Sequence, residues 1–576
     1  MLQAHQRTPF GRIVTVRGSL ARVGLLAADR AASAQARITV GRFVAIRCGG
    51  SSVVAMITDI SLETAAHDAS QIGTASVDLL GELVDDHGQL RFRRGVTNYP
   101  AIGDQVELIT HDELVAVFTP SGADHIDIGH LQLDASITAH VDLEQMLTKH
   151  FAVLGSTGVG KSSAVSLLLN EVLSARRELR VFLLDVHNEY GRCFGEHAQV
   201  MNTRNLKLPF WLFNFEEIVD VLFARRPGAP EELEILTEVI PLAKAMHSRH
   251  PGDSGVRRSE SRLSYSLDAP VPYRLSDLIA LIDERMGKLE NRSSRMMHHK
   301  LIGRIEAVRN DPRYGFMFEN ANIGGDTMAE VISQLFRLPA RGTPMTVMQL
   351  AGLPVEVVDS VVSVLCRLAF DFGLWSDGAS PLLFVCEEAH RYASADRTTG
   401  FGPTRKAVSR IAKEGRKYGV FLGLVTQRPA ELDATILSQC STVFAMRLAN
   451  DRDQDLLRAA APDAAANQLA FLPSLATREV LVFGEGVALP TRMRFKTLPA
   501  HQLPCGEAIS AHSPMDTGSH DLRFVQSVLE RWRGANTQRA AAADFDDTPA
   551  LAAPPMLQPS LGLDPDRFQL LKKPLR

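Results

Sequence analysis

Residues 155–163 read GSTGVGKSS, which satisfies the G-x4-G-K-[ST] spacing of a phosphate-binding loop. Glycines at these positions let backbone N–H groups turn inward and form an anion nest at the start of a helix. The lysine can then reach the β- and γ-phosphates of a nucleotide, and the serine after it can bind Mg²⁺. The motif follows the apolar run HFAVL and precedes a helical pattern, as its mechanism requires. The sequence therefore predicts a nucleotide site formed by Gly155, Ser156, Thr157, Gly158, Val159, Gly160, Lys161, Ser162 and Ser163.

Two adjacent carboxylates, Glu387 and Glu388, follow the apolar run at 382–386. Such a run is typical of a strand buried on both faces, and acids at its end would ordinarily belong to a solvated loop. A P-loop nucleotidase, however, needs one acid in the Mg²⁺ shell and another that activates the attacking water. We therefore predict Glu387 for the metal shell and Glu388 as the catalytic residue. Because Glu is one methylene longer than Asp, Glu387 is expected to contact a metal-bound water.

Polar residues also end two other apolar runs. Asp185 ends FLLD, where it could either join Ser162 and Glu387 around Mg²⁺ or cap the turn that follows. Gln427 ends VTQ, where its amide could sense the γ-phosphate or simply belong to a turn. Both alternatives remain open on the residues alone.

One cation is a candidate for completing a neighbouring subunit's site. Arg416 lies in IAKEGRKYG near the end of a predicted helix, where the helix dipole alone favours a positive charge. The sharper hypothesis is an arginine finger presented to the nucleotide of an adjacent subunit. Arg410, Lys413 and Lys417 lie nearby, so the spacing does not single out Arg416.

Composition sets limits on the function. The 576 residues carry a net charge of −4, so any DNA contact must come from a local basic patch, such as the lining of a pore. The six cysteines include no CxxC pair, which argues against a zinc site and fits a reducing compartment. Neither a signal peptide nor a long apolar run is evident. We expect a soluble cytoplasmic protein with no membrane segment.

The pattern of apolar residues predicts an α/β fold in several parts. Short β-type runs between residues 8 and 118 predict a small antiparallel barrel, and residues 132–150 read as a linker. From Phe151, strands alternate with helices, as in a parallel sheet. Mostly helical residues interrupt this alternation, which then resumes and includes a helix at 430–439. The predicted organisation is a barrel at 1–125, an ATPase core at 132–204 and 343–500, a helical insertion at 205–342, and a C-terminal helix, Ala/Pro-rich linker and tail at 501–576.

Together these motifs resemble the HerA family of hexameric DNA-translocating ATPases, within the wider group that includes FtsK. The resemblance covers residues 8–500 and depends on the order of its motifs. They are GSTGVGKSS, LLDVHNEYG, EEAHRY, IAKEGRKYG, TQRP and RLANDRD, together with FRRGVTNYPAIGD, which looks like the family's HerA–ATP-synthase barrel. The implied fold is a RecA-like P-loop ATPase core with an N-terminal small β-barrel and an inserted helical region.

The resemblance also implies a function. It implies a homohexamer that binds ATP and Mg²⁺ between subunits and passes double-stranded DNA through its central pore. Lys161 and Ser162 would bind phosphate and metal, Glu388 would be catalytic, Gln427 the sensor and Arg416 the finger in trans. The final residues FQLLKKPLR resemble a tail that braces neighbouring subunits. Members of the family work with a partner nuclease: NurA in DNA end resection and repair, or a sirtuin-like or other nuclease in antiviral defence.

Two alternatives stay open at this point. One is a conjugation or secretion ATPase of the VirB4 type, whose core motifs look alike. The other is an ATP-dependent ring scaffold that assembles and activates a nuclease with little translocation. DNA-stimulated hydrolysis distinguishes a DNA motor from both.

Overall fold

A computed structural model describes most of the chain. The described residues between positions 9 and 505 belong to one compact unit. The Ala/Pro-rich tract, the predicted bracing tail and residues 248–264 of the polar stretch lie outside the described residues. The structure describes residues 9–26, 38–62, 71–120, 122, 124–223, 228–247, 265–288, 291–318, 325–396, 402–461, 463–505, 525–527 and 529–530.

The N-terminal strands form a closed barrel, as the sequence predicts. Their order is β2-β1-β7-β3-β4-β5, and antiparallel pairing of β2 with β5 closes the ring. Closure leaves no unpaired edge between the first and last strands. Two of these strands were not predicted from the sequence: β2, which follows β1 after a turn at Gly18, and β6, which extends β5 as a hairpin. The bounds are β1 (Gly11–Arg17), β2 (Leu20–Leu26), β3 (Phe43–Cys48), β4 (Ser51–Ser61), β5 (Gln71–Asp86), β6 (Gln89–Arg94) and β7 (Gln105–Leu108).

The second sheet is the RecA-like core. Strands β12-β13-β11-β14-β15-β10-β16 are parallel neighbours in that order. Alternate residues of the central strands enter two apolar clusters, one shared with α3 and the other with α10 and α11. Helices therefore cover both faces, as a parallel sheet requires. The strands are β10 (Phe151–Leu154), β11 (Arg180–Asp185), β12 (Ala198–Met201), β13 (Met345–Gln349), β14 (Leu382–Cys386), β15 (Val420–Thr426) and β16 (Thr442–Ala445).

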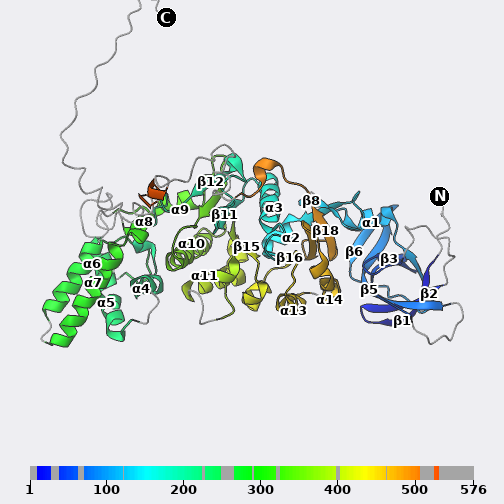
Figure 1. Ribbon diagram of the computed structural model, residues 1–576, viewed down its shortest axis with the longest axis horizontal. Helices are drawn as coiled ribbons and strands as arrows, with labels where there is room; N and C mark the ends of the chain where they lie inside the picture. The colour runs from blue at the N-terminus through cyan, green and yellow to red at the C-terminus, as the bar shows by residue number, and fades with distance from the viewer. Residues whose placement is uncertain are drawn as a thin grey trace, which may run out of the picture. The chain divides into compact units, whose positions relative to one another are not determined.

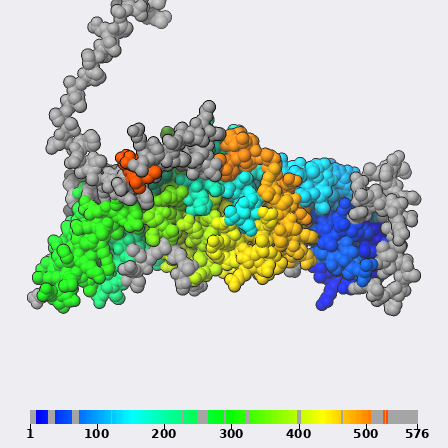
Figure 2. Space-filling model, in the orientation of Figure 1, coloured from blue at the N-terminus to red at the C-terminus, as the bar shows by residue number. Residues whose placement is uncertain are grey.

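The predicted linker at 132–150 is wrong, because this segment belongs to the sheet. Four antiparallel strands continue the sheet beyond β16, in the order β17-β18-β8-β9. Residues 479–495 and 125–142 consequently lie side by side although they are distant in sequence (Figures 1 and 2). The strands are β8 (His125–Leu131), β9 (Thr138–Asp142), β17 (Glu479–Gly484) and β18 (Thr491–Phe495).

Most helices lie where the apolar pattern predicts them. The predicted helix at 430–439 is an exception, because only a 3-10 helix at 429–431 and the short α12, at 434–437, form there. No described helix is both long enough and apolar enough to cross a membrane. Outside the helical insertion, the helices are α1 (His111–Phe118), α2 (Leu143–Thr148), α3 (Lys161–Ala175), α10 (Val355–Trp375), α11 (Gly402–Glu414), α12 (Ala434–Leu437), α13 (Asp451–Ala460) and α14 (Asp463–Ala466).

The inserted helices lie in the chain between β12 and β13, which are adjacent strands of the core sheet. Three of them, α5, α6 and α7, pack side by side (Figure 1). The sheet thus continues across the insertion, which confirms that a helical region is inserted into the core. Its helices are α4 (Phe215–Phe223), α5 (Pro230–His247), α6 (Leu275–Gly287), α7 (Arg292–Arg309), α8 (Gly315–Phe318) and α9 (Met328–Leu335).

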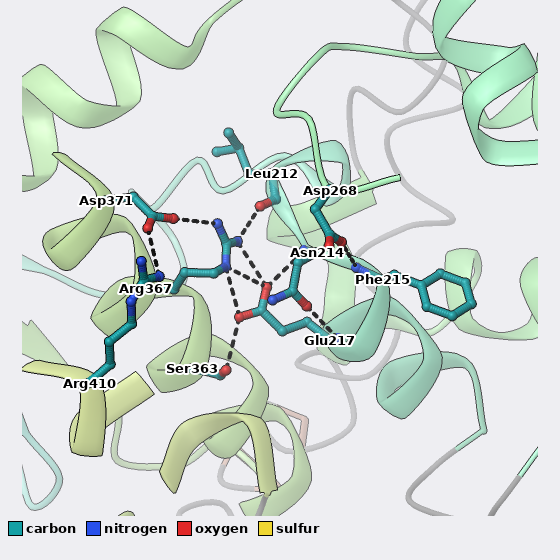
Figure 3. A network of polar contacts seen from close by, with 9 residues as sticks. All are labelled: Leu212, Asn214, Phe215, Glu217, Asp268, Ser363, Arg367, Asp371 and Arg410. Carbon is teal, nitrogen blue, oxygen red and sulfur yellow. Dashed lines mark hydrogen bonds and ion pairs between the residues drawn. The ribbon is translucent and has the colours of Figure 1, made fainter. Parts of the chain in front are cut away.

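A buried ion pair joins the first inserted helix to the core (Figure 3). Glu217 of α4 accepts hydrogen bonds from Arg367 of α10, and also from Ser363 Oγ at 2.9 Å. The same glutamate forms a capping box with Asn214, in which each side chain accepts the other's backbone N–H at 2.9 Å. One buried carboxylate therefore both starts α4 and fixes it to α10.

Candidate functional site

The phosphate loop has the backbone that its glycines predict. Gly158 and Gly160 have φ values of 78° and 100°, which other residues rarely adopt, and Gly160 is the N-cap of α3. A Cβ on Gly155 would lie 2.8 Å from the Met446 Cβ atom. The loop runs from the buried strand β10 into the N-terminus of α3, so its amides and the helix dipole favour an anion at the same place.

Two loop side chains have local partners. Lys161 Nζ donates to the Ser156 carbonyl at 2.9 Å. Burial lowers the pKa of Lys161, whereas the nearby charges of Glu388 and Glu387 oppose that shift. Thr157 Oγ1 donates to Gln427 Oε1, which brings the predicted sensor at the end of β15 against the phosphate loop. Lys161 and Gln427 thus lie at the same edge of the sheet.

Glu387 lies at the end of β14 and is 5% exposed. The Tyr190 hydroxyl donates to its Oε1 atom at 3.1 Å, and Oε2 has no hydrogen-bond partner among the described residues. Burial, reinforced by the charges of Asp185 and Glu189, raises the pKa of Glu387 well above its ordinary value. A cation near Oε2 would stabilise the ionised form of this carboxyl group.

Glu388 has a strained backbone. Its φ and ψ values are 50° and 44°, in the left-handed region, and the residue is 8% exposed. A non-glycine residue in that conformation costs of the order of 1–3 kcal/mol, and such strain gathers at functional sites. The carboxylate lies 3.2 Å from His390 Nδ1 and 3.6 Å from His187 Nε2. Two imidazoles therefore flank the acid that is predicted to activate water.

Asp185 makes the contacts of a turn cap. Its two carboxylate oxygens accept the backbone N–H groups of Glu189 and Tyr190, each at 3.0 Å. The side chain is fully buried, and burial raises its pKa in spite of these bonds. These contacts are those of the turn-capping alternative, and a role for Asp185 in the Mg²⁺ shell stays a prediction.

Arg416 lies away from the other predicted site residues. It is exposed in the short 3-10 helix that follows α11 and precedes β15, whereas Gln427 follows the other end of that strand. The ends of β15 are about 20 Å apart at ~3.3 Å per residue. Of the neighbouring cations, Arg410 pairs with Asp371 at 3.3 Å and stacks on Phe370. Lys413 and Lys417 are exposed, like Arg416.

The residues present fit a magnesium ion. Ser162 is the second residue of α3 and lies close to Tyr190, which donates to Glu387. Burial and the charge of Glu387 raise the pKa of Tyr190 well above its ordinary value, and a hydrogen bond with Ser162 opposes that rise. Glu387 Oε2, which has no partner among the described residues, would supply a second oxygen to the metal shell. No cluster of three or more His, Cys, Asp or Glu able to hold a metal occurs in the part of the chain that the structure describes. Mg²⁺ needs no such cluster, because it binds through few protein oxygens together with phosphates and waters.

Three further residues near the site were missed from the sequence. Tyr190 joins the Glu387 carboxylate to Ser162, Glu189 adds a charge that acts on Lys161 and Glu387, and His390 contacts Glu388. The first two follow Asp185 within the motif DVHNEY, and the third follows the paired acids. Their positions close to predicted strand ends could have indicated that they lie near the site. Which of these loops lie close together, however, depends on the order of the strands in the sheet.

Comparison with known proteins shows similarity to HerA helicases. The family described as "Helicase HerA, central domain" matches residues 126–369. The DNA double-strand break repair helicase HerA of Pyrococcus furiosus is 24% identical over 504 residues, covering 82% of this chain and 84% of that protein. The HerA helicase of Sulfolobus acidocaldarius is 26% identical over 458 residues, covering 78% and 80%. The chain is similar to HerA helicases over most of its length. With its phosphate loop and strand-end acids, this HerA-like chain is a P-loop ATPase.

Solved structures with a similar fold are more distant from this chain. VirB4 of Thermoanaerobacter pseudethanolicus is 12% identical and superimposes with a TM-score of 0.46, covering 66% of this chain and 99% of that one. The plasmid coupling protein TrwB in complex with an ATP analogue is 13% identical, with a TM-score of 0.44, covering 69% and 94%.

Proposed function

We propose that the chain is an ATP-driven translocase or helicase for double-stranded DNA, which works as a homohexamer with a partner nuclease. The observation that carries the proposal is the meeting of three strand ends at one sheet edge. There the phosphate loop after β10, the two glutamates after β14 and Gln427 after β15 come together. Two relatives named as DNA double-strand break repair helicases support DNA as the substrate.

The chemistry follows from this arrangement. Mg²⁺, when bound, neutralises phosphate charge. Loop amides and Lys161 hold the phosphates, the lysine exchanging its bond to the Ser156 carbonyl for a charge-assisted one. Glu388 orients a water molecule and takes its proton, while Gln427 reports the γ-phosphate through the end of β15. The buried positions of both glutamates keep these charges poorly screened by solvent.

The position of Arg416 supports a ring. Since it precedes β15 at the edge opposite the phosphate loop, it is too far away to complete the site of its own subunit. In a head-to-tail ring the same surface can face the neighbour's nucleotide. Arginine suits this role because its planar guanidinium binds phosphate oxygens through two parallel hydrogen bonds.

Mixed oligomers test this arrangement. Lys161→Ala and Arg416→Ala proteins are each expected to be inactive alone, because one loses phosphate binding and the other the finger. A 1:1 mixture should regain ATP hydrolysis, since about a quarter of its sites pair an intact loop with an intact finger. Hydrolysis is measured at steady state after the subunits are mixed in denaturant and refolded together, or are co-expressed.

Lys413→Ala is the matched control, because it removes an exposed cation from the end of α11, just before the 3-10 helix that contains Arg416. Its mixture with Lys161→Ala should be no more active than wild type diluted with Lys161→Ala. Absence of recovery in the Arg416→Ala mixture would remove Arg416 from the finger role, and full activity of Arg416→Ala alone would do the same.

The nuclease is proposed as a separate chain, because the sequence shows no clustered acids with nuclease spacing. A partner of the NurA type would place the motor in end processing and repair. A sirtuin-like or other nuclease would place it in antiviral defence, and both require the same ATP-driven movement of DNA.

A further inference from the structure

The imidazole of His390 lies between two strand ends of the site. Its Nδ1 atom is 3.0 Å from Thr426 Oγ1, at the end of β15, and 3.2 Å from Glu388 Oε2, just after β14. The side chain is 11% exposed, so water screens these contacts little. His390 is therefore placed to act on the predicted catalytic carboxylate and on the sensor strand together.

Glu388 needs such a partner. Its Oε2 atom is buried without an aligned hydrogen-bond donor among the described residues, although the imidazole nitrogen is within hydrogen-bonding distance. The other nearby imidazole, that of His187, is 3.6 Å from Oε1, which is beyond an ordinary hydrogen bond. A small rotation of His390 would satisfy Oε2 and fix the direction of the carboxylate.

Thr426 connects His390 to the phosphate loop. Its hydroxyl accepts the backbone N–H of Arg428 at 3.0 Å, and its carbonyl accepts the N–H of Gly155 at 3.3 Å. The next residue, Gln427, contacts Thr157 of the loop. A shift of the loop would therefore be transmitted to Thr426 Oγ1, the atom that lies 3.0 Å from His390 Nδ1.

We propose that His390 is a positioning residue. Its Nδ1–H donates a hydrogen bond either to Thr426 or to Glu388, and it changes to Glu388 when the phosphate loop is filled, so that the catalytic carboxylate is aligned. The inference rests on the proposed ATPase mechanism and deepens it. A neutral imidazole with its proton on Nδ1 has a single N–H there and can satisfy only one acceptor well. Burial lowers the pKa of His390, against the opposing charges of Glu388 and Glu431, and so favours the neutral form.

Amide substitutions test the role atom by atom. An asparagine side chain places an N–H close to the position of the imidazole Nδ1, whereas glutamine places one near that of Nε2. His390→Ala is expected to lower kcat for ATP about 10- to 100-fold through misplacement of Glu388, with KM for ATP little changed. His390→Asn should recover most of this loss, and His390→Gln should recover little.

Three results would overturn the proposal: a wild-type kcat in His390→Ala, equal rescue by Gln and Asn, or a raised KM with unchanged kcat. The Asn and Gln pair keeps the test decisive if the Ala protein does not fold. Thr426→Val, compared with Thr426→Ser, tests the other end, and only the valine is expected to lower kcat.

Glu388→Gln in the same assay separates the two levels of the account. If it is inactive while His390→Ala turns over normally, the His390 proposal fails and the ATPase mechanism stands. If Glu388→Gln itself turns over normally, the assignment of the catalytic acid fails.

Discussion

Replacing Glu388 with glutamine is expected to lower steady-state ATP hydrolysis about a hundredfold or more, while nucleotide still binds. Glutamine has nearly the same shape but cannot take a proton from water. Because Lys161 and the loop amides are untouched, the affinity for a fluorescent ATP analogue should stay within about twofold of wild type. The two measurements together separate lost proton transfer from lost binding.

Glu414→Gln is a suitable control, since it removes an exposed carboxylate from the end of α11, away from the phosphate loop. It should hydrolyse ATP at the wild-type rate. If Glu388→Gln retained more than about a tenth of that rate, the proton would have to go to another group. His187 or Glu387 would then be the first to examine, because both lie near the same carboxylate.

Arg367→Met is expected to destabilise the protein by about 3–5 kcal/mol, because it leaves Glu217 as a buried, unpaired carboxylate. Glu217 is 1% exposed and Arg367 is 17% exposed, so water cannot replace the lost partner. The methionine keeps much of the packing of the arginine stem. Urea denaturation followed by tryptophan fluorescence measures the effect, since Trp211 precedes Leu212, whose carbonyl accepts from Arg367.

Lys406→Met is the matched comparison for this ion pair. It breaks another link to α4, between Lys406 of α11 and Glu216, but both of these side chains are more than half exposed. Its effect should stay below about 1 kcal/mol. The double variant Glu217→Gln with Arg367→Met should be more stable than Arg367→Met, since it leaves no buried charge. Equal losses in Arg367→Met and Lys406→Met would show that burial does not determine the cost.

Local pattern was enough to predict the phosphate loop and most of the core strands. The glycines, lysine and serine of residues 155–163 define their own geometry, and Leu382–Cys386 form a buried strand for the reason that their composition indicates. The site roles of Glu387 and Glu388 could be predicted because a phosphate loop requires one acid near Mg²⁺ and another that activates water. The burial of both carboxyl groups was not predicted from the sequence and became evident only in the structure.

Other features depend on pairings distant in sequence. The linker interpretation of 132–150 failed because β9 and α2 are short, and because β9 pairs with β8, which is held to the sheet by β18, more than 300 residues later in the chain. Tyr190 and His390 were missed for the same reason. Their partners, Glu387 and Thr426, come from the ends of other strands. The order of strands in a sheet cannot be predicted from a short stretch of sequence.

The most direct test of the central claim is ATP hydrolysis by the purified protein with and without linear double-stranded DNA, with Glu388→Gln as the blank. We expect linear duplex to raise kcat severalfold, with an increase that depends on duplex length or ends, and we expect no increase in the blank. Hydrolysis that is present but indifferent to duplex DNA would contradict the proposed motor. The site would then belong to an ATP-dependent scaffold or to a motor acting on protein.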